Sequence, residues 1–294
     1  MVFRLIILRH GHKDQSPDAH GDGTGAPLEQ SRLGEIRAVA SRLIPELPTS
    51  IGRVRVLTTP VPRAIDTAEI LHAQFRRGLP RGVELLPVRV EPLLSSIDER
   101  DGMLVQLIPP QMVDLWKRGL GKTSSDGRES ESLRLLLEVG FEQTFGGSGI
   151  SSYEVACRIG CFVWREISAH RYDQDETLVC VSHSGNIELF MYLTILMTEY
   201  FGCGVQMESF KHLSPIQLFE RFDSLALAPL EAIYLDCVDL DQAAILELPL
   251  PCAGKRKFAI ELGIFRRQAD WLADYGIGQN FLRASSPQAR HDRS

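Results

Sequence analysis

Two histidines and an aspartate alternate just after an apolar segment, in the stretch IILRHGHKDQ at 6–15. If the chain stays extended there, His10, His12 and Asp14 lie on one face, which is a spacing that metal ligands use. The same stretch supports a second chemistry. Arg9 and His10 together offer a guanidinium that binds an anion and an imidazole nucleophile. Residues elsewhere in the chain decide between these two interpretations.

Three polar motifs each follow an apolar segment that predicts a buried strand. In open α/β sheets the ligand crevice lies beyond the carboxyl ends of the strands, so we expect the motifs to meet at one edge. They bring two arginines and two histidines to that edge, a cationic cluster that is costly to assemble without an anion. Guanidinium groups match the oxygens of phosphate, which is therefore the expected occupant. The motifs are RHG at 9–11, TTPVPR at 58–63 and SHSG at 182–185, and the four side chains are Arg9, His10, Arg63 and His183.

The segments around these motifs predict strands that alternate with helices. This order is typical of an α/β fold, a three-layer sandwich with a mostly parallel central sheet flanked by helices. Pro87 weakens one strand toward an edge position, and Pro62 suits a first helical turn. The predicted strands are 3–8, 53–58, 83–90, 177–182 and a last one at 231–238, and the predicted helices include 31–47, 151–167 and 187–200.

We expect one catalytic domain over residues 1–250, with a lid-like insertion at about 103–150 that shapes specificity. Past residue 250 the pattern changes. PCAGKRK (251–257) is typical of a linker, and the next nineteen residues predict an amphipathic helix. The polar end of the chain is typical of disorder. Residues 251–294 are thus predicted to form a C-terminal helical extension and a disordered tail.

The composition narrows the class of protein. A net charge of −6 argues against a nucleic-acid-binding protein, which usually carries a basic excess. The six cysteines contain no CxxC pair, as expected for a reduced cytoplasmic protein. The apolar N-terminal run is too short for a signal peptide, and the stretch 187–197 is far below the roughly 18 residues of a membrane span. We therefore expect a cytoplasmic protein without a nucleic-acid or membrane partner.

The three motifs together resemble those of the histidine phosphatase superfamily, in its first, phosphoglycerate-mutase-like branch. LRHG (8–11) resembles the Arg-His-Gly that ends the first strand of that family. TPVPRAIDTA (59–68) resembles the segment with the second arginine, and SHSG resembles the later Ser-His-Gly. The resemblance runs in order over about residues 3–200. It implies a phosphoglycerate-mutase-like sandwich and a reaction that needs no metal or other cofactor.

The resemblance also implies a role for each site residue. His10 would attack phosphorus through a neutral imidazole and form a phosphohistidine. Arg9, Arg63 and a protonated His183 would hold the equatorial oxygens of the phosphoryl group. Backbone N–H groups from Ser184 onward, at the start of the next helix, would add further donors.

A leaving alkoxide needs a proton from a carboxylic acid, which in this family follows the third strand. The segment SSIDERDG (95–102) offers Asp98, Glu99 and Asp101. The Glu-Arg pair resembles the mutase segment Asn-Glu-Arg-His-Tyr-Gly, so Glu99 is the predicted donor and Asp98 the second choice. The choice among the three acids stays open.

Some positions depart from the family pattern. His12 and Lys13 stand where many members have Glu followed by Ser or Thr, and Ser16 replaces the usual Asn as a candidate substrate-binding residue. The segment ERDG also lacks the aromatic residue of the mutases. These differences favour a hydrolase over a phosphoglycerate mutase.

We therefore predict a metal-independent phosphomonoester hydrolase that acts on a phosphorylated small molecule or a phosphoprotein. Two alternatives remain: a mutase that uses the same intermediate, and a non-catalytic module that binds phosphate or a phosphoprotein. The metal site suggested by the first stretch is disfavoured for two reasons. Gln15 stands where a His-x-His-x-Asp-His metal signature has its last histidine, and the positive charge of Arg9 would repel a divalent ion. The substrate and the oligomeric state are not encoded in any recognisable motif.

Overall fold

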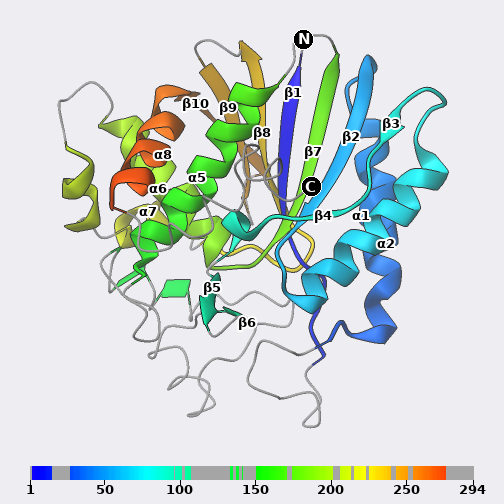
Figure 1. Cartoon of the computed structure of the whole chain (residues 1–294), viewed down its shortest axis with the longest axis horizontal. Helices are drawn as coiled ribbons and strands as arrows, with labels where there is room; N and C mark the ends of the chain where they lie inside the picture. The colour runs from blue at the N-terminus through cyan, green and yellow to red at the C-terminus, as the bar shows by residue number, and fades with distance from the viewer. Residues whose placement is uncertain are drawn as a thin grey trace, which may run out of the picture.

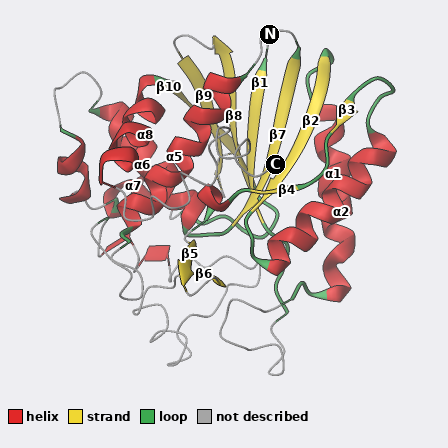
Figure 2. Cartoon of the chain, viewed as in Figure 1, coloured by secondary structure: helices red, strands yellow, loops and turns green. Residues whose placement is uncertain are grey.

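The computed structural model has one eight-stranded sheet at its centre, with helices on both faces (Figure 1, Figure 2). Along the sheet the order is β10-β9-β8-β1-β7-β2-β3, and β4 pairs with β2 as well. The structure describes residues 2–14, 27–95, 97–100, 103–106, 133–134, 137–138, 141, 150–170, 174–200, 206–212, 215–222, 225–239, 243–250 and 254–275. The strands of this sheet are β1 (Phe3–Arg9), β2 (Ile51–Thr58), β3 (Glu84–Leu85), β4 (Arg89–Val90), β7 (Asp175–Ser182), β8 (Ala232–Asp239), β9 (Ala243–Leu250) and β10 (Gly254–Glu261).

The sheet is mixed, and its parallel part carries the predicted site. β1 pairs in parallel with β7, β7 with β2, and β2 with β3 and β4. On the other side β8 is antiparallel to β1, and β9 and β10 continue antiparallel. A separate hairpin joins β5 (Ile97–Arg100) to β6 (Met103–Gln106). The predicted three-layer α/β fold is confirmed, with an antiparallel edge added to its parallel strands.

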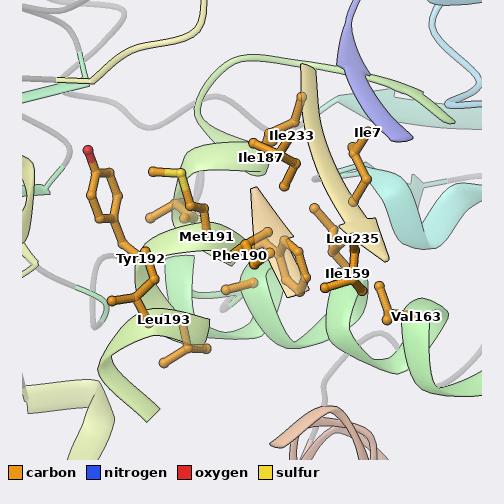
Figure 3. Close-up of a cluster of buried hydrophobic side chains, with 14 of the residues drawn as sticks. Ile7, Ile159, Val163, Ile187, Phe190, Met191, Tyr192, Leu193, Ile233 and Leu235 are labelled. Atoms are coloured by element: carbon orange, nitrogen blue, oxygen red, sulfur yellow. The ribbon is translucent and has the colours of Figure 1, made fainter. Parts of the chain in front are cut away.

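Both faces of the sheet are buried, which is why β1 is an almost continuous apolar run. Phe3, Leu5 and Ile7 point into a large core, part of which Figure 3 shows. Ile6 and Leu8 point into a second core on the opposite face. The larger core involves α5 (Ser152–Ala169), α6 (Asn186–Glu199), α7 (Ile216–Arg221) and α8 (Gly263–Tyr275), and the second involves α1 (Leu33–Glu46) and α2 (Pro62–Gly78).

Local sequence signals explain several boundaries. α2 begins at Pro62, as its fixed φ and missing N–H predict. α5 begins after Ser151, whose Oγ accepts a hydrogen bond from the Glu154 N–H at 3.1 Å. The predicted strand at 83–90 is divided into β3 and β4 with Pro87 between them, at the edge of the sheet.

The prediction for the residues after 238 was wrong in three elements. β8 is not the last strand, because β9 and β10 follow it. Residues 254–257 belong to β10 rather than to a linker, and the following helix begins at Gly263 rather than at 258. This edge strand exposes three charged residues, Lys255, Arg256 and Lys257. Charges on an edge strand discourage pairing with other chains. They also give the segment the composition of a linker, which explains the wrong prediction.

The sequence-based boundary at residue 250 falls between β9 and β10, which are hydrogen-bonded strands of one sheet. α8 packs on α5 and buries Phe265 and Trp271 in the larger core. Residues 254–275 therefore share that core. Most of the predicted insertion at 103–150 and the tail after residue 275 lie outside the described residues.

Replacing Phe265 with alanine is expected to lower the free energy of unfolding of the whole fold by about 3–5 kcal/mol, because the fully buried ring leaves a cavity. Denaturant unfolding followed by circular dichroism measures this loss. The exposed Arg266→Ala variant, on the same helix, should change stability by less than about 0.5 kcal/mol. An unchanged main transition in Phe265→Ala would mean that α8 is energetically separate from the sheet.

No helix within the described ranges has both the length and the apolar character needed to cross a bilayer.

Candidate active site

The carboxyl ends of β1, β2 and β7 lie side by side, and their register brings the three predicted motifs together. Arg9 pairs with Ser182, and Thr58 with Val181. Just past the strands, the His10 N–H donates to the Ser182 carbonyl at 3.0 Å, and the Thr59 N–H donates to that of Val181 at 3.2 Å. The chain segments that carry His10, Thr59 and His183 thus leave the sheet at one point.

The four predicted side chains are all buried, and the structure brings them to one place. Arg63 Nε lies 3.0 Å from His10 Nε2. The rings of His10 and His183 meet edge to face with their centroids 5.1 Å apart. Arg9 donates from one guanidinium nitrogen to the Leu227 carbonyl at 2.6 Å. Its positive charge contributes to lowering the pKa of both imidazoles.

The orientation of the His10 ring follows from its hydrogen bonds. Nδ1 lies 2.6 Å from the Gly11 carbonyl oxygen, which only accepts, so Nδ1 carries the proton. Nε2 therefore holds the lone pair and accepts from Arg63. Gly11 suits this turn because a Cβ there would lie 3.0 Å from the Ile36 side chain. The arrangement presents Nε2 as the nucleophilic nitrogen.

His183 is held on one side only. Its Nε2 lies 2.8 Å from Thr59 Oγ1, whereas within the described part of the chain its buried Nδ1 has no hydrogen-bond partner. Sequence reasoning did not single out Thr59, nor Thr67, whose Oγ1 accepts from the Gly11 N–H at 3.1 Å. Both residues lie within the TPVPRAIDTA segment, so the motif itself was the available signal.

Burial and the two arginines control the protonation of both imidazoles. Burial, followed by the charges of Arg63, His183 and Arg9, lowers the pKa of His10 well below its usual value. Burial, Arg63 and Arg9 lower the pKa of His183 in the same way. Both rings are thus neutral in the free protein at neutral pH, which suits a nucleophile. The predicted protonated His183 requires a bound anion to stabilise the added charge.

These lowered pKa values make folding stability fall in acid. Below about pH 6.5 the two histidines of the unfolded chain bind protons that the folded protein rejects, so stability decreases as the pH falls. Urea unfolding at pH 8, 6.5 and 5.5 should show a smaller decrease for His183→Ala than for the wild type. Equal decreases in the two proteins would contradict a lowered pKa of His183 in the folded state.

Ser184 and the start of α6 complete one side of the site. The Ser184 hydroxyl donates to Glu188 at 3.0 Å, and Gly185 adopts a φ of 88° before the helix begins at Asn186. Glycine tolerates this left-handed conformation without strain. The turn directs the helix N-terminus, which favours anions, toward the strand ends.

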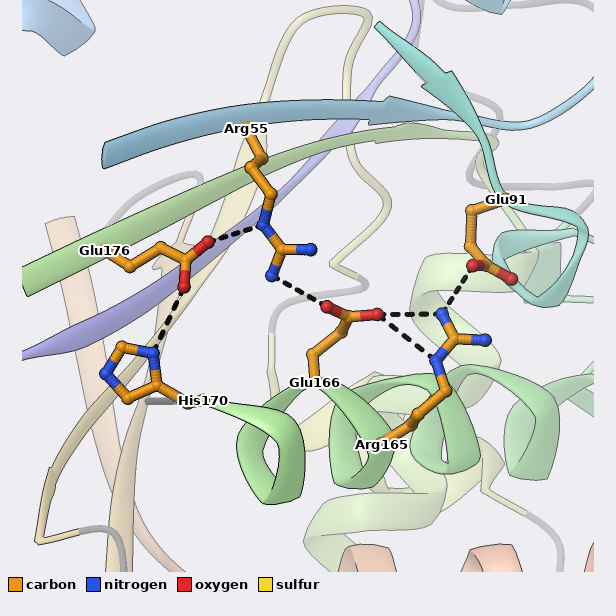
Figure 4. A network of polar contacts seen from close by, with 6 residues as sticks. All are labelled: Arg55, Glu91, Arg165, Glu166, His170 and Glu176. Carbon is orange, nitrogen blue, oxygen red and sulfur yellow. Dashed lines mark hydrogen bonds and ion pairs between the residues drawn. The ribbon is translucent and has the colours of Figure 1, made fainter. Parts of the chain in front are cut away.

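The ion pair between Glu91 and Arg165 helps to hold the segment that leads to the predicted proton donor (Figure 4). The Glu91 N–H donates to the Thr58 carbonyl at 2.7 Å, and the Glu91 carboxylate binds Arg165 of α5. The Ser182 hydroxyl donates to the Leu94 carbonyl within η3 (Pro92–Leu94). These bonds fix the stem of the β5–β6 hairpin beside β2 and β7.

Asp98 and Glu99 lie on β5, which Figure 1 shows beyond the carboxyl ends of the parallel strands. Their side chains are outside the described residues, as are Asp101 and Ser16. The roles predicted for these four residues stay predictions.

The metal-ligand spacing of the first stretch is not formed. β1 ends at Arg9, so the alternation of His10, His12 and Asp14 does not place them on one strand face. Arg32 donates to His12 Nδ1 at 2.8 Å, and Glu35 lies 3.4 Å from its Nε2. Among the residues that the structure describes, no cluster of three or more His, Cys, Asp or Glu side chains could hold a metal ion.

No protein family and no curated protein matches the sequence. Solved structures to which the chain is similar include two phosphatases and a phosphoglycerate mutase. The mycobacterial glucosyl-3-phosphoglycerate phosphatase is 18% identical, with 80% of this chain and 91% of that chain covered at a TM-score of 0.47. The phosphoserine phosphatase of Entamoeba histolytica in complex with 3-phosphoglyceric acid is 13% identical, with 79% of this chain and 90% of that chain covered at a TM-score of 0.46. The phosphoglycerate mutase of Plasmodium falciparum is 12% identical, with 84% of this chain and 89% of that chain covered at a TM-score of 0.37. Similarity at this level carries no argument about activity, which depends on the site residues.

Proposed function

We propose that the chain is a metal-independent phosphomonoester hydrolase of the histidine phosphatase superfamily, with a phosphohistidine intermediate on His10. One observation carries the proposal: the bond from His10 Nδ1 to the Gly11 carbonyl leaves the Nε2 lone pair directed at Arg63 and next to His183. A neutral nucleophile surrounded by fixed cations suits attack on a phosphoryl group. The substrate is a phosphorylated small molecule or a phosphoprotein.

The reaction has two steps. His10 Nε2 forms a bond to phosphorus while the bond to the leaving oxygen breaks, and the oxygen takes a proton from an acid. Water then attacks phosphorus and gives a proton back to the acid, while the bond between phosphorus and Nε2 breaks, which releases inorganic phosphate and restores the neutral His10. The Arg63 N–H that now binds Nε2 turns to the phosphoryl oxygens, which Arg9, His183 and the backbone N–H of Ser184 also bind. The Gly185 N–H is not among these donors, because it binds Glu188.

Glu99 remains the candidate for the acid, with Asp98 the second choice. Among the residues that the structure describes, the buried carboxylate of Glu188 accepts hydrogen bonds from Ser184, Gly185 and Leu227 and is therefore not available to a leaving group. The proposal places the acid on the hairpin that follows η3, as the resemblance implies. Aryl phosphates need little acid assistance, so Glu99→Ala should lose turnover of an alkyl phosphate much more than of an aryl phosphate.

The proposal is tested with a generic aryl phosphate, with and without EDTA, and with a rapid quench in acid or alkali. We expect turnover that EDTA does not reduce and a phosphoenzyme that survives alkali but not acid. Phosphate binding without turnover would instead identify a binding module. Transfer between two positions of a phosphorylated acceptor, with little hydrolysis, would identify a mutase. Loss of activity in EDTA would overturn the metal-independent mechanism.

A further inference from the structure

Glu188 on α6 is a buried carboxylate that the proposed reaction does not use. Its side chain has 0% exposure, and both of its oxygens accept hydrogen bonds. Oε1 accepts from the Ser184 hydroxyl at 3.0 Å and from the Leu227 N–H at 2.8 Å. Oε2 accepts from the Gly185 N–H at 2.6 Å. Burying a carboxylate is costly unless its hydrogen bonds and its surroundings compensate for the lost hydration.

The groups bound by Glu188 come from two segments that flank the candidate site. Ser184 and Gly185 form the turn directly after His183. Leu227 belongs to the loop before β8, and its carbonyl accepts from Arg9 at 2.6 Å. One carboxylate therefore connects the turn beside His183 to the loop that holds the Arg9 guanidinium.

Helix capping explains only part of this arrangement. A Glu three residues after the N-cap commonly binds the N-cap N–H, as Glu188 binds that of Gly185. Capping does not require the bond to Leu227, which is 39 residues away in sequence. It also does not require complete burial. Burial raises the pKa of Glu188, while the Leu227 N–H and the positive charge of Arg9 oppose that rise.

We propose that Glu188 is a positioning residue for the phosphate site: it holds the Ser184–Gly185 turn and, through Leu227, the Arg9 guanidinium in the geometry that binds a phosphoryl group. This inference rests on the proposed function. Glu188 touches no reacting atom. Its effect passes through the direction of Arg9 and through the backbone N–H of Ser184.

The chemistry of substitution makes the role testable. A glutamine at 188 has the same shape, but one end of its amide is an NH2 group. Since N–H donors face both oxygens of Glu188, Glu188→Gln must turn a donor toward a donor. Glu188→Asp keeps the charge and can still cap Gly185, but its shorter side chain cannot reach Gly185 and Leu227 together.

The matched control is Glu176→Gln. Glu176 is also a buried carboxylate, and it lies on β7 at the end opposite His183, where it binds Arg55 and His170 (Figure 4). Neutralising it should lower thermal stability without changing the phosphate site. It therefore separates the loss of a buried carboxylate from the loss of the specific bonds that Glu188 makes.

The experiment measures binding of inorganic phosphate by calorimetry and kcat and KM for an aryl phosphate, on full-length protein with native circular dichroism. We expect both Glu188 variants to bind phosphate roughly ten- to a hundredfold more weakly, as for other residues that orient a ligand-binding group, with a matching fall in kcat/KM. Glu176→Gln should bind phosphate as the wild type does. Should Glu188→Gln fail to fold, Glu188→Asp gives the result, because its cap and charge are retained.

Phosphate binding and turnover within twofold of the wild type in Glu188→Asp or Glu188→Gln would overturn the inference. So would an equal loss of phosphate affinity in Glu176→Gln, which would show a general effect of stability. A wild-type protein that neither binds phosphate nor hydrolyses the ester would overturn the proposed function first, and the inference with it. These results are distinct because the wild type is measured in the same series.

Discussion

Replacing His10 with alanine is expected to lower kcat for an aryl phosphate by on the order of 10⁴-fold or more, because no other group occupies the position of its Nε2. The Gly11 carbonyl fixes the ring through Nδ1, and Arg63 lies 3.0 Å from Nε2. Without the imidazole, the cationic groups still attract phosphate but cannot form the covalent intermediate. Phosphate binding should therefore persist while the acid-labile phosphoenzyme disappears.

His12→Ala is the matched control for this variant. His12 lies two residues further along the same segment, but it binds Arg32 and lies near Glu35 rather than His10. We expect its kcat to remain within a few fold of the wild type. If His10→Ala keeps even a few per cent of wild-type turnover, the nucleophile lies elsewhere. If His12→Ala loses as much as His10→Ala, the metal-ligand interpretation of the first stretch has to be reconsidered.

The clustering of Arg9, His10, Arg63 and His183 could be predicted because it depends on topology rather than on detail. Short apolar segments that alternate with helices become parallel strands, and the carboxyl ends of parallel strands share one edge. Three polar motifs at three such ends therefore meet, whatever the exact register. The His-x-His-x-Asp spacing was misleading for a similar reason, because its meaning depends on the strand continuing past Arg9, and the strand ends there.

Other features depend on contacts that one segment of sequence does not show. β10 carries Lys255, Arg256 and Lys257 because it is an edge strand, so its composition alone resembles a linker. Glu188 could be recognised in sequence as a helix cap, but its bond to Leu227 exists only in the folded chain. The antiparallel pairing of β8, β9 and β10, and the core that they share with α5, α6 and α8, also depend on contacts that hydrophobic periodicity alone does not reveal.

Arg63→Ala is expected to lower kcat/KM by about 10²- to 10³-fold, the loss typical of removing one donor that stabilises charge in the transition state. Arg63→Lys keeps a positive charge but loses the planar fork that binds two phosphoryl oxygens at once. We therefore expect KM of the lysine variant to return part of the way to the wild-type value, while its kcat stays close to that of Arg63→Ala. Arg76→Lys, on the exposed end of the same helix, is the matched control and should behave as the wild type.

The pH profile distinguishes a role at the phosphate site from a loss of stability. Arg63 is one of the charges that lower the pKa of His10, after burial. Removing it raises that pKa, so the acidic limb of kcat/KM, which reports the free enzyme, should move to higher pH in Arg63→Ala. In Arg63→Lys the limb should stay close to that of the wild type, because the positive charge remains. An unshifted profile in Arg63→Ala would show that the guanidinium does not act on the nucleophile, however large the loss of activity.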